Sequence, residues 1–267
     1  MDIATLVGLI MGIVAVLLGM FFKHVAFSVL LNPAAFFIII IGTAAAVITA
    51  FPGNELKKVP KLFKILFTKA KQMEGADIIK MFVEMAQESR KNGILSLEAK
   101  IAELEDPFLK RGINFIVDGQ TPEFVRNTLT EEIEAMEERH HGYAGVFTQA
   151  GTYAPTLGVL GAVIGLIAAL GNMGDTDALG HAISAAFVAT MLGIYTGYVL
   201  WHPFGNKLKR KSKSEAKLKY MMIEGILCIQ SGLHPAILEA KMVSYLPESE
   251  RAKVSEDKGD KGDKGGS

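Results

Sequence analysis

The feature that most constrains this chain is a set of four long stretches without a charged residue. They contain no aspartate, glutamate, lysine or arginine, and they are 20, 31, 35 and 29 residues long: residues 3–22, 24–54, 140–174 and 178–206. A helix needs roughly 20 apolar residues to cross a bilayer, and it satisfies its own backbone hydrogen bonds in lipid. We therefore expect four transmembrane helices, near residues 3–22, 33–51, 147–170 and 182–202.

The alternative is a soluble protein with four buried core helices, but soluble helices of this length rarely lack charge on every face. The first stretch does not have the features of a signal peptide, because no basic residue precedes it and no clear small-x-small cleavage site follows. The single cysteine, Cys228, excludes an internal disulfide. The net charge of zero gives no indication of a nucleic-acid partner.

The distribution of lysine and arginine predicts the orientation. Of 28 such residues, 14 lie in 54–145 and 13 in 206–267. Positively charged loops favour the cytoplasmic side, so we expect both blocks and both termini in the cytoplasm. The expected organisation is transmembrane helices 1 and 2 in 1–53, a cytoplasmic helical domain in 54–145, transmembrane helices 3 and 4 in 146–205, cytoplasmic C-terminal helices in 206–250 and a disordered tail in 251–267.

No segment has the alternation of a strand, so the fold class is all-α, an integral membrane protein with a cytoplasmic helical domain. We expect helices over 76–91 and 96–104, and another that begins at Asp106-Pro107. Thr121-Pro122 repeats this start signal. The helix that begins there has no strong breaker before the third span, so we expect one long helix, and the fourth span should likewise continue to about residue 230.

The segment that follows the second span is amphipathic. Apolar residues recur at helical spacing between lysines: Leu56, Val59, Leu62, Phe63 and Leu66. This pattern is typical of a helix on the inner membrane surface, and equally of a helix packed on protein.

Signals for an enzyme are poor. Glu137 and His141 share one helix face and could ligate a metal, but two ligands alone make a weak site. No serine has an evident base, and no glycine-rich phosphate loop is present. We expect neither catalytic residues nor a metal or cofactor.

Small residues form stripes along the third and fourth spans. One stripe contains Ala154, Gly158 and Ala162. Two more contain, at the same spacing of four, Gly161, Gly165 and Ala169, and Ala185, Ala189, Gly193 and Gly197. Such stripes let helices approach closely in lipid, so we expect tight helix packing there.

Two residues beside these stripes have open interpretations. Thr190 follows the fourth-span stripe and either faces a cavity or bonds back to its own helix carbonyl. Pro155 interrupts the hydrogen bonds of the third span and should kink the helix. The kink either belongs to a helix that flexes or lines a cavity, or is a tolerated structural kink.

No span contains an ionisable carboxylate or ammonium group, although ion transport through a membrane usually needs one. If this chain handles ions, a partner helix packed on the small-residue stripes must supply the carboxylate.

Three segments together resemble the MotA family, the A subunits of bacterial flagellar stators: "TYAPTLGVLGAVIGLIAAL", "SAAFVATMLGIYTGYVLWHPFGNKLKRKSK" and "RKNGILSLE". The resemblance extends over residues 1 to about 247 and is closest to the proton-type members of Bacillus-like bacteria. It implies a ring of five A chains in the bacterial cytoplasmic membrane, around a dimer of the single-span B subunit, MotB. The B helix carries the essential aspartate.

The resemblance also implies residue roles. Arg90 and Glu98 match the charged pair that the family uses on its rotor protein, FliG. Pro155 and Pro203 match two prolines tied to conformational coupling, and Thr190 matches a position on the ion path. Ala162 matches a position where sodium-type relatives carry threonine. A hydroxyl there could coordinate sodium and alanine cannot, so the resemblance implies proton coupling.

Other functions are conceivable for such a chain. An ExbB/TolQ-like subunit energises envelope transport by similar ion coupling, but those relatives resemble three-span proteins. A non-conducting membrane scaffold would explain the two polar blocks but not the kink and hydroxyl beside the small stripes. An intramembrane enzyme would need a nucleophile with its base.

Overall fold

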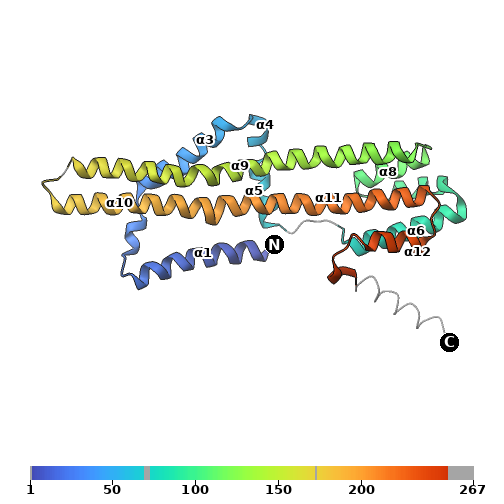
Figure 1. Cartoon of the computed structure of the whole chain (residues 1–267), viewed down its shortest axis with the longest axis horizontal. Coiled ribbons are helices and arrows are strands. Elements are labelled where there is room, and N and C mark those ends of the chain that lie inside the picture. The colour runs from blue at the N-terminus through green and yellow to red at the C-terminus, as the bar shows by residue number, and fades with distance from the viewer. Residues whose placement is uncertain (1, 69–72, 172, 252–267) are drawn as a thin grey trace. The chain divides into compact units, whose positions relative to one another are not determined.

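The computed structural model describes residues 2–68, 73–171 and 173–251. Every regular element in these ranges is a helix, as Figure 1 shows, so the expected all-α fold is confirmed. The tail predicted to be disordered, 251–267, lies outside the described residues except for Arg251.

The chain divides into two compact units. The first comprises Met1–Ala70 and Arg139–Lys211, and the second comprises Lys71–Glu138 and Ser212–Ser267. Two long helices, α9 (Pro122–Leu170) and α11 (His202–Gln230), contribute residues to both units. The first unit therefore extends past the borders expected at 53, 145 and 205.

Four helical segments are long and apolar enough to cross a membrane, as expected. They are Ile3–Phe22 (α1), Phe27–Ala50, and parts of Pro122–Leu170 and of Thr176–Gln230. The second consists of η1 (Phe27–Leu30), α2 (Pro33–Phe36), the π-helical η2 (Phe37–Ile41) and α3 (Gly42–Ala50). The fourth consists of α10 (Thr176–Tyr195), the π-helical η4 (Thr196–Trp201) and α11.

The fourth helix begins before the predicted start of its span at residue 182. The Asp175 carboxylate accepts hydrogen bonds from the backbone N–H groups of Asp177 and Ala178, both at 3.0 Å. This N-cap satisfies two amide groups of the first turn, so the helix starts at Thr176 and the preceding loop is short.

The amphipathic segment forms two helices, α4 (Gly53–Leu56) and α5 (Val59–Phe67). Leu62 and Leu66 are buried in one cluster with Phe147 of α9 and Phe204 of α11. Of the two alternatives for this segment, packing on protein describes its apolar face.

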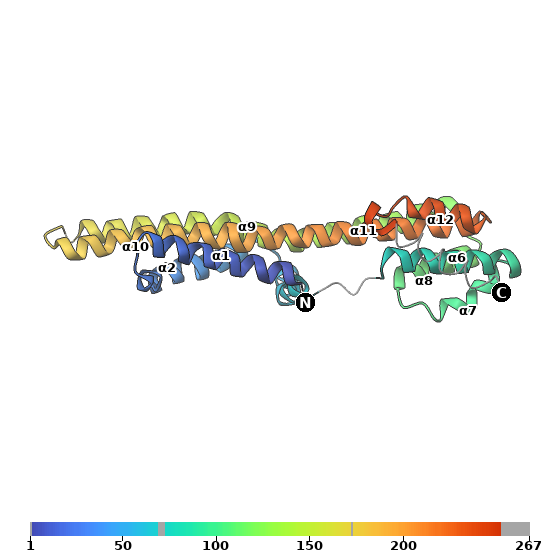
Figure 2. The ribbon, with the colours of Figure 1, turned by 90° about the horizontal axis from the view of Figure 1, so that it is seen from below.

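The second unit contains α6 (Gly75–Asn92), η3 (Ile94–Leu97), α7 (Glu98–Ile101), α8 (Pro107–Val117) and α12 (Pro235–Val243), together with parts of α9 and α11. Figure 2 shows these helices from a second side. Their core is built from large apolar residues, including Phe82, Phe108, Ile113, Met221 and Ile226.

One helix boundary in this unit differs from the prediction. The helix expected over 96–104 is regular only as α7, Glu98–Ile101, after a 3₁₀ turn. The next helix begins at Pro107, and its N-cap Asp106 is held in an extended conformation, as expected before proline. The Asp106 side chain accepts from the N–H groups of Phe108 and Leu109 at 2.8 and 3.1 Å, which confirms the predicted start signal.

Candidate functional site

Helices α9 and α10 run side by side in both ribbon views (Figure 1, Figure 2), and small residues form their contact. A Cβ atom added to Gly193 would lie 2.7 Å from the Ala154 carbonyl oxygen and 2.8 Å from the Cα atom of Gly158. A Cβ added to Gly158 would lie 2.9 Å from the Ala189 carbonyl oxygen. The two backbones therefore touch, and no side chain larger than hydrogen fits between them at these glycines.

The other small residues continue this contact. Added Cβ atoms on Gly161 and Gly165 would lie 3.1 Å from the Cβ atoms of Ala189 and Ala186, respectively. The Ala185 carbonyl accepts a 3.4 Å hydrogen bond from Asn32 of the second span. Gly158, which belongs to the other stripe of α9, makes the closest backbone approach. The predicted packing residues thus lie at the interface, and one of them, Gly193, lies opposite Gly158 at its tightest point.

Pro155 is half-buried within α9 and packs on Gly197. A Cβ added to Gly197 would lie 2.8 Å from both the Pro155 Cγ atom and the Gly151 carbonyl oxygen. Because proline has no N–H, the carbonyl four residues earlier lacks its usual helical donor, and that carbonyl belongs to Gly151. The freed carbonyl therefore lies against a glycine of the neighbouring helix.

Pro203 is exposed in the first turn of α11, directly after the π-helical η4. A proline in a first turn is tolerated, but it cannot donate to the carbonyl of Val199 in the preceding turn. The regular α-helical ladder is interrupted there, and the wider π turn occupies this stretch.

The Thr190 hydroxyl donates to the Ala186 carbonyl at 3.3 Å, so the structure has the back-bonded arrangement. Thr190 remains half-buried, and its oxygen can still accept a hydrogen bond. Ala162 is also half-buried, on α9.

Arg90 and Glu98 are both exposed in the second unit. Arg90 lies in the last turn of α6, and Glu98 begins α7. Between them, Gly93 adopts φ 85° and ψ 163°, a conformation that essentially only glycine takes. Leu97 is fully buried and fixes the turn on the core. The spacing of the two charges is therefore set by a defined turn.

Glu137 and His141 do not form part of a larger cluster. In the described portion of the chain, no group of three or more histidine, cysteine, aspartate or glutamate residues is placed to hold a metal.

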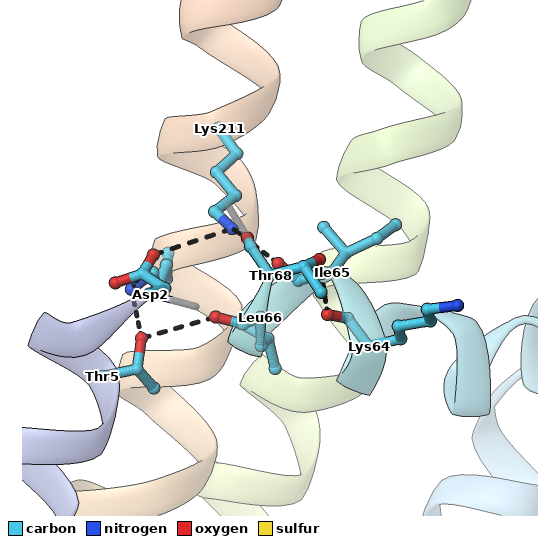
Figure 3. A network of polar contacts seen from close by, with 8 residues as sticks. Asp2, Thr5, Lys64, Ile65, Leu66, Thr68 and Lys211 are labelled. Carbon is cyan, nitrogen blue, oxygen red and sulfur yellow. Dashed lines mark hydrogen bonds and ion pairs between the residues drawn. The ribbon is translucent and has the colours of Figure 1, made fainter. Parts of the chain in front are cut away.

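A polar network joins α1, α5 and α11, and sequence reasoning missed it (Figure 3). The Asp2 carboxylate lies 2.6 Å from the Lys207 ammonium and 3.7 Å from that of Lys211. The hydrogen bond from Lys207 holds the pKa of Asp2 below its usual value despite some burial, and burial lowers the pKa of Lys211. The only local signal is the spacing of the two lysines, four apart on one helix face.

The same network caps the C-terminal end of α5. The Phe67 carbonyl accepts from the Asp2 backbone N–H at 3.0 Å, and the Leu66 carbonyl accepts from the Thr5 hydroxyl at 3.4 Å. Lys211 donates to the carbonyls of Ile65 and Thr68 at 2.5 and 2.9 Å. Residues of two other helices thus satisfy carbonyls that a helix end leaves unpaired.

The second unit contains a charged group that sequence reasoning also missed. Glu224 of α11 is buried, and its carboxylate contacts the Arg126 guanidinium at 2.7 Å and the Lys241 ammonium at 2.6 Å. Burial acts to raise the pKa of Glu224, but the hydrogen bonds from Lys241 and Arg126 outweigh it and leave the pKa lowered. The carboxylate links α9, α11 and α12.

The comparison with known proteins assigns the family. A profile of the MotA/TolQ/ExbB proton channel family matches residues 100–221. The chain is 59% identical to motility protein A of Bacillus subtilis (strain 168) over 256 residues, which is 96% of this chain and 95% of that protein. The chain belongs to the MotA family.

Solved structures agree with this family assignment. The fold matches a chain of the flagellar MotAB stator complex from Bacillus subtilis with a TM-score of 0.88 and 60% identity, covering 93% of this chain and 97% of that one. It matches a chain of C. jejuni MotAB with a TM-score of 0.89 and 29% identity, at the same coverage of 93% and 97%. The resemblance found in the sequence is thus confirmed, and the MotA-family chain is a membrane protein and not an enzyme.

Proposed function

We propose that this chain is the A subunit of a flagellar stator, which conducts protons together with a B subunit and converts their flow into torque on the rotor. The observation that supports the proposal is the structural match to a chain of the flagellar MotAB stator complex from Bacillus subtilis. This match covers 93% of the present chain. In that complex, the A-type chain is assembled with MotB.

The B subunit supplies an ionisable group that this chain lacks. The four spans of this chain contain no carboxylate or ammonium group, so a proton that crosses the membrane needs such a group from another subunit. A single-span B helix with an aspartate provides this group. We propose a ring of five A chains around a B dimer, in the bacterial cytoplasmic membrane, with both termini of each A chain in the cytoplasm.

Proton binding is the step that drives the ring. A ligand shifts a conformational equilibrium only by its different affinity for the two states. Here the ligand is the proton on the B aspartate, and protonation changes which A-ring contact is preferred. Pro155 and Pro203 lie where the helical ladders of α9 and the fourth helix are interrupted, so the helices can bend there.

Ala162 and Thr190 support proton coupling. Ala162 offers no oxygen to a dehydrated sodium ion, whereas the Thr190 hydroxyl can accept a hydrogen bond from water on the path. Swimming speed should therefore stay constant when external sodium is varied at fixed proton-motive force. A speed that follows sodium would contradict proton coupling.

Arg90 and Glu98 contact the rotor protein, FliG. Both side chains are exposed, and the Gly93 turn holds them in a defined arrangement. The Arg90→Glu/Glu98→Lys variant should abolish most swimming and leave the A–B complex at its normal level in membranes. Loss of the complex would mean that these residues serve assembly instead.

The experiment that tests the function is deletion of the gene, scored by swimming and by staining of filaments. Filaments that are present but motionless, with motion restored by the wild-type gene, support the stator function. Normal swimming in a strain with no second stator gene would contradict it. A defect in envelope transport with normal motility would favour the ExbB/TolQ-like alternative.

A further inference from the structure

The turn between α4 and α5 and the exposed side of α5 carry four lysines that the stator function does not use. Lys57, Lys58, Lys61 and Lys64 are all exposed, and the sequence from Leu56 to Thr68 contains no acidic residue. Lys57 and Lys58 form the turn between the two helices, and Lys61 and Lys64, three residues apart, lie on one side of α5. We name these four residues the lysine face.

The lysine face lies at the boundary of the membrane region. The second candidate span ends at Ala50, and α4 begins at Gly53. The other end of α5 bonds to the start of the first span, through the 3.0 Å hydrogen bond from the Asp2 N–H to the Phe67 carbonyl. Both ends of this segment are therefore tied to the ends of membrane spans on the same side.

The apolar side of α5 is already occupied by protein. Leu66 is fully buried, and the Phe63 ring packs edge-to-face on Phe147 and Phe204, with centroids 5.2 and 6.1 Å away. An amphipathic helix free to bind a bilayer would insert this side into the acyl boundary. Because this side is occupied, the exposed side of α5 carries mainly lysine, so headgroup attraction must dominate any contact with lipid.

Two nearby lysines, in contrast to the lysine face, have partners within the protein. Lys207 and Lys211 form ion pairs with Asp2, and Lys211 also donates to carbonyls at the end of α5. In Figure 3 the side chain of Lys64 extends away from this network. The carboxylate nearest in sequence, Glu55, lies 3.4 Å from the Cβ position of Gly142 and is thus directed to α9.

We propose that the lysine face binds the phosphate headgroups of anionic phospholipids in the adjacent leaflet. Clusters of four or more basic residues next to a membrane span attract anionic lipid, and the attraction falls off within a Debye length. Lysine also keeps its ammonium group in the headgroup layer while its aliphatic stem lies along apolar surface. The binding selects anionic over zwitterionic lipid and weakens in salt.

The test uses the purified complex of this chain with its B subunit, in micelles that contain equal amounts of phosphatidylglycerol and phosphatidylcholine. The lipid retained after gel filtration is quantified for each protein. The wild type should retain several-fold more phosphatidylglycerol than phosphatidylcholine, and the ratio should fall to about one in K57Q/K58Q/K61Q/K64Q. The variant with arginine at the same four positions should keep the wild-type ratio.

A matched control removes the same number of charges elsewhere. Lys80, Lys91, Lys213 and Lys217 are exposed residues of the second unit. The K80Q/K91Q/K213Q/K217Q variant should keep the wild-type lipid ratio. An unchanged ratio in the lysine-face variant, or an equal loss in the control, would overturn the proposal.

Two further measurements separate the causes. Phosphatidylglycerol should raise the melting temperature of the wild-type complex, and inorganic phosphate at the same concentration should not. An equal effect of phosphate would mean general anion binding and would overturn the lipid assignment. Since the readout is bound lipid rather than swimming, a failure here is distinct from a failure of the stator function.

Discussion

The two units bring helices together in different ways, and glycine shows the difference. In the first unit, the atoms nearest to Gly158 and Gly193 belong to the backbone of the facing helix. In the second unit, Gly112 lies under the Cδ1 atom of Ile226, and Gly225 lies under the ring of Phe82. Glycine thus lets backbones touch in one unit and makes room for a large side chain in the other.

The surroundings explain this contrast. Between helices in lipid there is no hydrophobic driving force, so association depends on close packing and on small residues. In water, the burial of large apolar side chains is the main driving force, as in the core around Phe82 and Ile226. A facing backbone cannot move aside, whereas the end of an isoleucine side chain can. Substitutions at the two kinds of glycine should therefore differ in cost.

The largest effect is expected for Gly193→Ala. The new methyl group would lie 2.7 Å from the Ala154 carbonyl oxygen, so α9 and α10 must separate. We expect a loss of about 3 kcal/mol of stability, measured by thermal unfolding of the complex in detergent, and loss of swimming. Gly180→Ala is the control on the same helix, because a Cβ there has nothing within 4 Å. Equal behaviour of the two variants would contradict the backbone contact.

A smaller effect is expected for Gly112→Ala in the second unit. The methyl group would clash with the Cδ1 atom of Ile226 and lie 3.2 Å from the Cδ1 atom of Leu129, both at the ends of side chains that can rotate, so we expect a cost of about 2 kcal/mol. Ile226→Val removes the clashing Cδ1 atom and alone should cost about 1 kcal/mol. The double variant should be more stable than the sum of the two costs predicts, measured as an unfolding double-mutant cycle. Simple additivity would show that the side chain already moves aside freely.

The smallest effect concerns charge in the second unit. Glu224→Gln should cost about 1 kcal/mol at neutral pH, because the hydrogen bonds from Arg126 and Lys241 lose their ionic partner. Because the pKa of Glu224 is lowered in the folded state, its ionised carboxylate stabilises the fold at pH values above the ordinary carboxylate pKa. This stabilisation is lost as the pH falls through the lowered pKa. Between neutral and acidic pH the wild type should therefore lose more stability than the variant. Parallel stability profiles would show that Glu224 is not an ion pair in solution.

Local signals in the sequence predicted the fold well. Runs without charge predicted the four spans, and Asp106-Pro107 and Thr121-Pro122 predicted two helix starts correctly. These features depend only on residues that are close together in the sequence, so the sequence alone is sufficient to predict them. The early start of the fourth helix at Thr176 was missed, although the capping residue Asp175 is adjacent to it.

Contacts between distant residues could not be predicted in the same way. Asp2 and Lys207 are far apart in the sequence, and nothing local pairs them. Gly158 was recognised as part of a stripe, but its place opposite Gly193 depends on the rotation of two helices about their axes. The roles of Thr190, Arg90 and Glu98 came from resemblance to a family and remain predictions.

The cap on α5 implies an order of events during synthesis. The carbonyls of Ile65 and Thr68 accept from Lys211, which the ribosome adds more than 140 residues after them. The chain between these partners includes the third and fourth spans. Closure of the cap must therefore wait until the last span has left the ribosome. The cap on α5 is therefore complete only after all four spans have been synthesised.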